Sequence, residues 1–440
     1  MTPSSASASA MSDEAQKDSG MRDTEKMQPS TATNPWDPSA FPDGGTEAWL
    51  VVLGAFCAMF VSFGWIGAIG VFQEHYQLNQ LRSYSPSEVA WIPAVESFFM
   101  FIGGSWVGRM QDLYGPRWLL PIGTFLHVFG LMMASISKKY YQFLLSQAIC
   151  SGIGTSMIFY PAAACLATWF MKKRAAAFGL AACGSGLGGI LFPIIVVRLI
   201  EDIGFAWTMR TCAFLILFLM IIACLTVKSR IPPQKTPVKA TDFVKPLAEM
   251  PFLLLSLSMF FTFVGLFVPF IFIPIEAYAN GMGAMNSVYL LSVLNAVSIL
   301  GRTLPAPLAD KYGRFNVVII MSWLTAIFTL AIWIPANSNA VRWVYAAFVG
   351  LSSGTIVSMG PALAAQISDV RQVGVRTGTM YMFVAVAVLI GNPIGGALVT
   401  DNHTNYRNLK IFAGVLMVAG SVTLMAARVS ISGLKLAAKV

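Results

Sequence analysis

Hydrophobic residues in this chain are gathered into long runs that carry almost no formal charge, six in each part of the sequence. Each run is close to the ~20 residues that an α-helix needs to cross ~30 Å of hydrocarbon. Their many Gly and Pro residues are typical of membrane helices that pack closely together. The pattern predicts an all-α membrane protein with twelve transmembrane helices in two six-helix halves. The predicted spans cover residues 49–72, 89–108, 118–136, 141–167, 175–197, 211–227, 251–275, 288–306, 316–334, 343–363, 377–399 and 411–427.

The segments around these runs set the predicted domain boundaries. Residues 1–42 are rich in Ser, Thr, Pro, Ala and charged side chains without apolar periodicity, which predicts a disordered cytoplasmic tail. The two halves are expected at 43–228 and 251–428. Between them, residues 229–250 contain several prolines and basic residues and are expected to form a cytoplasmic linker, and 429–440 a short cytoplasmic tail.

Composition agrees with a lipid environment and orients the chain. The residues are 56% hydrophobic and 11% charged, whereas soluble domains are roughly 25% charged. The net charge of +9 does not indicate nucleic-acid binding, because the basic residues lie between the apolar runs rather than on one face. Most lie in connections on one side, so we expect a multi-pass cell-membrane protein with both termini in the cytoplasm. A glycosylation sequon at Asn402 then falls outside.

Cysteine, histidine and glycine patterns narrow the class of function. The six cysteines all lie within apolar runs, and the three histidines are far apart, so the sequence lacks a disulfide framework and a metal-ligand motif. A phosphate-binding loop of the form G-x-x-x-x-G-K-[ST] is also absent from the sequence. We therefore expect no cofactor and no enzymatic activity, and instead the secondary transport of a small organic solute across a lipid bilayer.

A short polar sequence after the second run recurs after the eighth. Residues 108–117 read GRMQDLYGPR and residues 306–314 read APLADKYGR. In a turn between antiparallel helices, glycine permits positive φ, and an aspartate opposes the positive dipole end of the next helix and pairs with basic neighbours. A capped turn explains one copy, but two copies at matching positions make that reading too weak alone. The residues singled out in the two copies are Gly108, Asp112, Gly115, Arg117, Asp310, Lys311, Gly313 and Arg314.

Two formal charges lie inside predicted spans, Glu96 and Arg302. A guanidinium in hydrocarbon costs at least ~2.5–3.5 kcal/mol, so it normally faces a wet cavity or a partner. The planar fork of Arg302 suits a carboxylate or similar anion; the alternative is that it reaches the inner interface and pairs with Asp310. Glu96 is a candidate proton carrier, and its alternative is an interhelical hydrogen bond without coupling.

Five further polar residues complete the predicted substrate pathway. Each has a plainer alternative, because polar side chains in spans often form helix-to-helix hydrogen bonds worth only ~0.6 kcal/mol. For the histidine, a packed and hydrogen-bonded ring is the commoner case. These residues are Tyr160, His127, Asn295, Ser298 and Asn392.

With these motifs the sequence resembles the major facilitator superfamily, over about residues 43–430. Members carry the repeated motif after helices 2 and 8 as a gate latch. The resemblance therefore implies that the residues singled out in the two copies are gating residues, and that transport occurs by alternating access. Asp43-Gly44-Gly45, followed by Trp49, is similar to the entry signature of the monocarboxylate porter family. The sequence GSGLGG at 184–189, and Asn295 through Arg302, resemble its fungal branch.

The departures from that family bear on the substrate. Its transporters of simple monocarboxylates carry a lysine in helix 1 and an aspartate one turn before the helix 8 arginine, where Gly67 and Ser298 stand here. An incomplete relay favours a larger, less acidic solute and export of a secondary metabolite. Import of a carboxylate or vitamin, and a sensor that does not transport, remain alternatives. An anionic solute and proton coupling stay open, and we expect no nucleic-acid partner.

Overall fold

The computed structural model describes residues 41–232, 244–369, 372–399 and 405–433, with residues 435, 438 and 439. The predicted tail up to residue 40 and the predicted linker residues 233–243 lie outside this description. The described residues are mainly helical and contain no strand longer than a single bridge. This confirms the all-α prediction.

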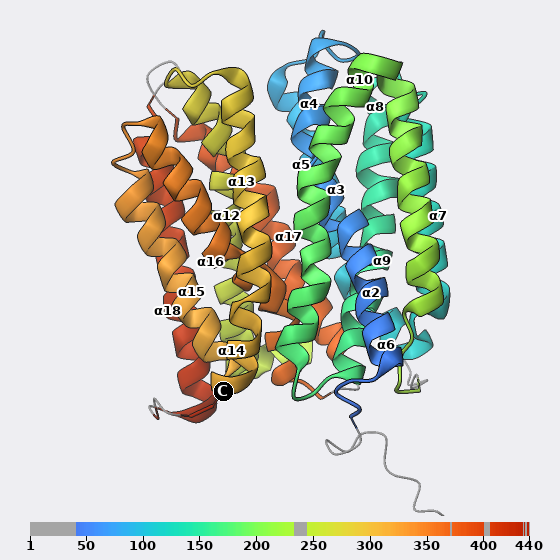
Figure 1. The fold of residues 1–440 in the computed structure, drawn as a ribbon, viewed down its shortest axis with the longest axis vertical. Coiled ribbons are helices and arrows are strands. Elements are labelled where there is room, and N and C mark those ends of the chain that lie inside the picture. The colour runs from blue at the N-terminus through green and yellow to red at the C-terminus, as the bar shows by residue number, and fades with distance from the viewer. Residues whose placement is uncertain are drawn as a thin grey trace, which may run out of the picture. The chain divides into compact units, whose positions relative to one another are not determined.

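The helices up to residue 226 form the first set of spans (Figure 1). Their bounds are α2 (Thr46–Val61), α3 (Phe63–Ile66), α4 (Ile69–Leu78), α5 (Pro86–Ile102), α6 (Gly104–Tyr114), α7 (Pro116–Ala134), α8 (Tyr140–Phe143), the π-helix η2 (Leu144–Ser151), α9 (Gly152–Trp169) and α10 (Arg174–Thr226). Several of these labels share one crossing, since α2 to α4, α5 with α6, and α8 to α9 follow one another with little or no interruption.

The second set begins after a short 3₁₀ helix. Its bounds are η3 (Lys245–Ala248), α12 (Met250–Ala279), α13 (Ala284–Thr303), α14 (Pro305–Tyr312), α15 (Arg314–Phe328), the π-helix η4 (Thr329–Trp333), α16 (Asn339–Gln366), α17 (Val373–Ala397) and α18 (Arg407–Ser432). Here α13 with α14, and α15 with η4, each make one crossing.

The long helix α10 holds two crossings. Among the described residues, eleven helices are long and apolar enough to span a membrane, and α10 is one of them with 53 residues. A continuous helix of that length would reach about 80 Å, more than twice the hydrocarbon thickness. Gly204 interrupts it with φ 76° and ψ 164°, a conformation that glycine adopts without strain. The chain therefore turns back there (Figure 1), and the spans number twelve, as predicted.

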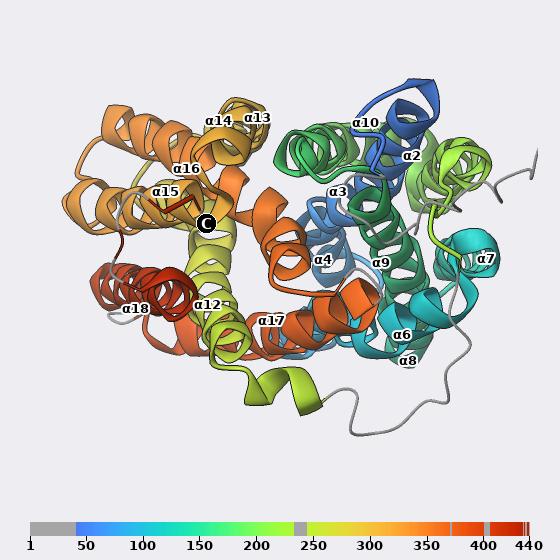
Figure 2. The same ribbon diagram turned by 90° about the horizontal axis from the view of Figure 1, so that it is seen from below.

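The two sets of spans meet along two seams. In one, the first part of α10 packs against α13 and α14; in the other, α5 and α6 pack against α17. Figure 2, which views the ribbon along the helices, shows α17 beside α6. We call these the α10–α13 seam and the α6–α17 seam.

Glycines bring the backbones together in the α6–α17 seam. A Cβ atom added to Gly108 would collide with the carbonyl oxygen of Gly374, and one added to Gly378 would collide with that of Gly104. Both helices thus carry glycines four residues apart at the crossing, an arrangement that lets membrane helices approach closely. Any larger side chain at these positions would force the seam apart.

Candidate functional site

The repeated motif lies on helix ends rather than in loops. The turn between the helices is shorter than the motif, because α6 continues to Tyr114 and α14 to Tyr312. Helical geometry stops at Gly115 and Gly313, which have φ 73° and 104°, as a glycine after a helix C-terminus commonly does. The helices continue because nothing before these glycines breaks them, so each motif aspartate stands on a rigid last turn.

Asp112 joins the two sets of spans. Its Oδ1 accepts a hydrogen bond from the backbone N–H of Gly374 at 3.1 Å, and its Oδ2 accepts one from Val375 at 2.9 Å. Both donors belong to the first turn of α17, where unpaired N–H groups and the helix dipole favour a carboxylate. The contact bridges 262 residues of sequence.

Asp310 makes the matching contact in the other seam. Its two oxygens accept from the N–H groups of Ala175 and Ala176 in the first turn of α10, at 3.0 and 2.9 Å. Arg314 pairs with the same carboxylate at 2.9 Å and also donates to the carbonyl of Met171 at 2.7 Å. Each aspartate thus caps the fifth span of the opposite set. The prediction that it opposes the dipole of the next helix in the chain is wrong, because the capped helices are α10 and α17.

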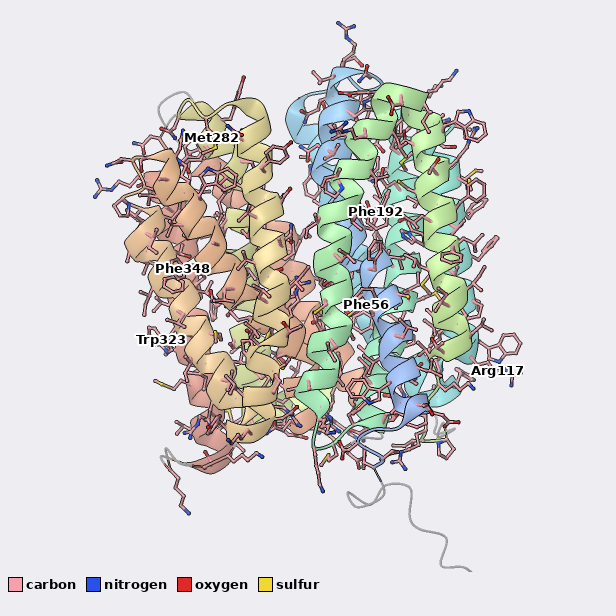
Figure 3. All side chains as sticks on the ribbon, in the orientation of Figure 1. Phe56, Arg117, Phe192, Met282, Trp323 and Phe348 are labelled. Atoms are coloured by element: carbon pink, nitrogen blue, oxygen red, sulfur yellow. The ribbon has the colours of Figure 1, made fainter. Side chains whose placement is uncertain are left out.

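The basic residues of the motif differ between the copies. Arg314, the first residue of α15, comes four residues after Asp310 and reaches it across the break at Gly313, whereas Arg117 comes five residues after Asp112 because Pro116 intervenes. Arg117 is exposed at the margin of the bundle (Figure 3). Lys311 is also exposed and lies over the ring of Tyr312. Arg314 therefore has clear contacts that agree with the gating prediction, whereas the exposed Arg117 makes no comparable contact among the described residues.

A buried arginine at the start of α10 reinforces this end of the bundle. Arg174 is 1% exposed, and it donates to the carbonyls of Phe170 and Ala167 at the end of α9 and of Ala365 near the end of α16. A cation at helix C-termini complements their negative dipole ends. We call the end of the bundle where these contacts lie the motif end, defined by Asp112, Asp310 and Arg174.

Arg302 lies in the α10–α13 seam and is 5% exposed. Its Nη1 donates to the carbonyl of Ala182 at 2.8 Å and to Ser185 Oγ at 2.7 Å, both on α10. The alternative prediction, that Arg302 pairs with Asp310, is therefore wrong. The carboxylate of Asp310 instead binds Arg314 and two N–H groups of α10. The Nε of Arg302 is buried and has no hydrogen-bond partner within the described ranges, so this buried cation has neutral partners only and an unused Nε–H.

The other predicted residues of α13 differ in availability. Asn295 lies close to α10. A Cβ atom added to Gly189 would be 3.4 Å from the side-chain amide of Asn295. Ser298 is 1% exposed, and its hydroxyl donates to the carbonyl of Asn295 at 2.7 Å. Ser298 therefore serves its own helix. The side chain of Asn392 and the sequon at Asn402 lie outside what the structure describes.

Glu96 and His127 belong to one buried network among the first spans. Glu96, 1% exposed, accepts from Trp65 Nε1 at 2.9 Å, Gln147 Nε2 at 3.1 Å and Ser151 Oγ at 3.1 Å. The hydroxyl of Ser151 also lies 2.8 Å from Nδ1 of His127. The network holds the carboxyl group with neutral donors only, and in the described structure it shares no contact partner with Arg302.

Tyr160 packs within an aromatic cluster between the two sets of spans. Its hydroxyl donates to the carbonyl of Phe101 at 2.8 Å, and its ring lies 5.8 Å from Tyr381 of α17. Tyr381 in turn stacks on Phe101 at 5.7 Å and contacts Phe159 edge to face at 5.5 Å. The hydroxyl of Tyr160 thus forms a hydrogen bond between helices, and the aromatic rings form the contact between α17 and the first set of spans.

Sequence patterns missed a second buried charge cluster. Glu276 is 1% exposed near the end of α12, and its Oε1 is 3.2 Å from Arg342 and 3.0 Å from Lys410, while Trp333 donates to its other oxygen. Glu276, Arg342 and Lys410 each lie one residue outside a predicted apolar run. The hydropathy pattern therefore placed them in the connections between spans. One signal could have found them: helices commonly continue a turn beyond the apolar run, and opposite charges there can pair.

Comparison with known proteins agrees with this geometry. A family model described as the Major Facilitator Superfamily matches residues 51–314 and 255–432. "MFS-type transporter 1" of Ophiocordyceps sp. is 49% identical over 407 residues, covering 92% of this chain and 91% of that protein. The "Fujikurins efflux protein" of Gibberella fujikuroi is 45% identical over 388 residues, covering 88% and 83%.

A solved structure shares the fold at low sequence identity. The human organic anion transporter TETRAN superposes with a TM-score of 0.69 at 14% identity, over 87% of this chain and all of that chain. Its likeness concerns the arrangement of helices alone. Twelve spans, two matched aspartate contacts and these similarities together place the chain in one family: it belongs to the major facilitator superfamily, as a multi-pass membrane transporter and not an enzyme.

Proposed function

We propose that this protein exports a secondary metabolite from the cytosol by alternating access, with the motif end as its cytoplasmic gate. The observation that carries the proposal is the pair of carboxylate contacts by which Asp112 and Asp310 join the two halves, residues 43–228 and 251–428. Carboxylate-to-N–H bonds at a helix start are strong enough to hold a closed state and few enough to be broken by ligand binding. The efflux name of the Gibberella relative supports the direction.

The transported solute is a larger, mainly apolar molecule with an anionic group. Arg302 supports the anionic group, because it is a buried cation with neutral partners and an unused Nε. The aromatic cluster around Tyr381 supports an apolar body, because ring faces and edges bind flat hydrophobic molecules well. This combination fits the fungal branch of the monocarboxylate porter family better than it fits carriers of small acids such as lactate.

Proton coupling rests on Glu96 in this proposal. A buried carboxyl group whose donors are all neutral can accept or release a proton without leaving a buried cation unpaired. Ser151 extends the hydrogen bonds to His127, which supplies a second proton-binding group. Export driven by a proton gradient would load and unload this network once in each cycle.

The proposed orientation rests on the charge distribution. Basic residues concentrate at the motif end and in the connections on the same side, so the positive-inside rule supports an orientation with both termini in the cytoplasm. In this proposal the membrane is the cell membrane. Glycosylation at Asn402 then belongs to the outer side, and enzymatic deglycosylation of the purified protein would reveal it as a shift in electrophoretic mobility.

Metabolite profiling of a deletion strain tests the direction of transport. We expect one metabolite to accumulate in the cells and fall in the medium, with rescue by the wild-type gene. Asp112→Ala or Asp310→Ala should reach the membrane but fail to rescue, and the exposed motif variant Arg117→Gln should rescue fully. Loss of a solute from the cells would instead indicate import, and unchanged profiles with altered signalling would indicate a sensor.

The role of Arg302 has a separate test. Arg302→Lys keeps the charge but loses the planar fork, so the apparent affinity for an anionic metabolite should fall about tenfold or more in vesicle uptake. Neutral analogues of the same metabolite should be affected much less. Equal transport of the anionic metabolite by both proteins would rule out bidentate recognition.

A further inference from the structure

Asp43 has an unusual place just before the first span. Its Oδ1 accepts hydrogen bonds from three successive backbone N–H groups, those of Met171 at 2.8 Å, Lys172 at 2.7 Å and Lys173 at 3.1 Å. Its own N–H donates to the carbonyl of Trp169 at 3.2 Å. Asp43 also has φ 49°, the one positive φ outside glycine among the described residues, a conformation that aspartate tolerates better than most residues. Side chain and backbone together therefore fix the α9–α10 connection.

Neighbouring contacts hold the same segment in place. The guanidinium of Arg230 lies 4.7 Å from the ring centre of Phe41 and donates to the carbonyl of Thr168 at 2.9 Å. Burial lowers the pKa of Arg230, but a guanidinium remains charged at neutral pH. Trp49 packs on Phe170 at 5.4 Å. The segment before α2 is thus attached to the end of α9 and to the chain that follows α10.

The start of α10 therefore receives two carboxylates. Asp43 binds the N–H groups of residues 171–173 and comes from the same half, whereas Asp310 binds those of Ala175 and Ala176 and comes from the other half. The two sets of donors follow one another along the chain. Contacts within a half persist when the halves separate, but contacts between halves do not.

The other half repeats this arrangement in altered form. Glu249, directly before α12, forms an ion pair with Arg376 in the first turn of α17, and α17 is the helix that Asp112 caps from the opposite half. Asp43 and Glu249 hold equivalent places, one before the first helix of each half. An acidic residue before the first helix thus contacts the start of the fifth span in both halves. This recurrence favours a shared role over a contact that is particular to one site.

We propose that Asp43 is a positioning residue for transport: it fixes the turn at 171–173 so that the N–H groups of Ala175 and Ala176 face Asp310 whenever the halves close. This rests on the proposed gate at the motif end. Without Asp43, each closure would have to order the turn again, and that entropic cost would shift the equilibrium toward the open gate.

Native Cys183 provides a reporter for the gate. Its Sγ lies in the α10–α13 seam, 3.2 Å from the carbonyl of Gly179 and 4.0 Å from that of Ile299. Cys183 is partly buried there. In a protein that retains Cys183 but lacks the other five cysteines, a membrane-impermeant maleimide applied from the motif-end side of inside-out vesicles should label it faster when the seam opens.

We expect Asp43→Ala to raise the initial rate of Cys183 labelling about fivefold, the size of effect that follows from losing one helix-cap interaction, and to lower the maximal transport rate with little change in KM. Asp43→Asn keeps an acceptor oxygen and tolerates positive φ, so it should fall between Asp43→Ala and wild type. Glu47→Gln, an exposed acid in the first turn of α2, is the matched control and should behave as wild type.

Two results would overturn the proposal in distinguishable ways. If Asp310→Ala raises labelling but neither Asp43 variant does, Asp43 is a structural contact and the gate stands. If Asp310→Ala also leaves labelling unchanged, the gate itself is wrong and the role of Asp43 falls with it. Should Asp43→Ala not reach the membrane, the labelling rate of Asp43→Asn decides between these results.

Discussion

Among the side chains that the structure describes, each half contains one fully buried glutamate, and the two are balanced in opposite ways. Glu96 in the first half accepts hydrogen bonds from Trp65, Gln147 and Ser151, which are all neutral. Glu276 in the second half lies against two cations, Arg342 and Lys410. Both side chains are 1% exposed, so the difference arises from their partners and not from their burial.

This difference assigns different roles to the two halves. Removing the Glu276 carboxylate would leave two buried cations without a counter-charge, so Glu276 serves as a structural counter-ion. Glu96 can change protonation state while its neighbours stay hydrogen-bonded, because none of them carries a charge to be stranded. The second half thus has a rigid electrostatic core, and the first half has a group suited to coupling.

The largest effect is expected from Glu276→Gln. Removing the carboxylate leaves Arg342 and Lys410 buried and unpaired, which should cost ~3–5 kcal/mol. Thermal melting of the purified protein in detergent would record this as a large fall in Tm or a failure to express. Glu201→Gln, an exposed acid in α10, is the control. A wild-type melting curve for Glu276→Gln would remove the claimed asymmetry.

A smaller loss of stability is expected from Lys410→Met. Glu276 keeps Arg342 and the Trp333 hydrogen bond, while methionine fills most of the lysine volume. The free energy of unfolding should fall by about 1–2 kcal/mol, measured by the same melting assay. A loss as great as that of Glu276→Gln would mean that Lys410, and not the carboxylate, organises the cluster.

Glu96→Gln should change stability by only about 1 kcal/mol, since glutamine keeps an acceptor for Trp65 and Ser151. Its effect should lie in coupling. Wild-type vesicles should transport faster under a proton gradient, and the variant should transport at one rate with or without it. If the variant remains accelerated by the gradient, Glu96 is a structural residue like Glu276.

The smallest effect is expected from Ser151→Ala, which removes the link between Glu96 and His127. Interhelical hydrogen bonds in membranes average ~0.6 kcal/mol, so Tm should hardly move. The dependence of transport on pH should nonetheless shift if His127 shares the proton. Identical pH profiles would restrict the coupling group to Glu96 alone.

Local sequence patterns predicted the parts of the fold that local chemistry decides. Twelve apolar runs became twelve spans, and Gly115 and Gly313 took the positive φ that their motif implied. The partners of Asp112 and Asp310 were not predictable from local sequence. The donors to Asp112 lie 262 and 263 residues away, and those to Asp310 lie 134 and 135 residues away, in each case in the other half. Hydropathy likewise separated Glu276 from Lys410, which meet only in the folded bundle.

Alternating access requires opposite movements at the two ends of the bundle, and paired spin-label distances measure them directly. One pair, at Lys172 and Lys311, reports the motif end, and another, at Arg82 and Tyr278, reports the opposite end; all four side chains are exposed. We predict that Asp310→Ala lengthens the first distance and shortens the second relative to wild type. If both distances stay unchanged, or both lengthen together, Asp310 does not hold a gate closed and the mechanism is contradicted.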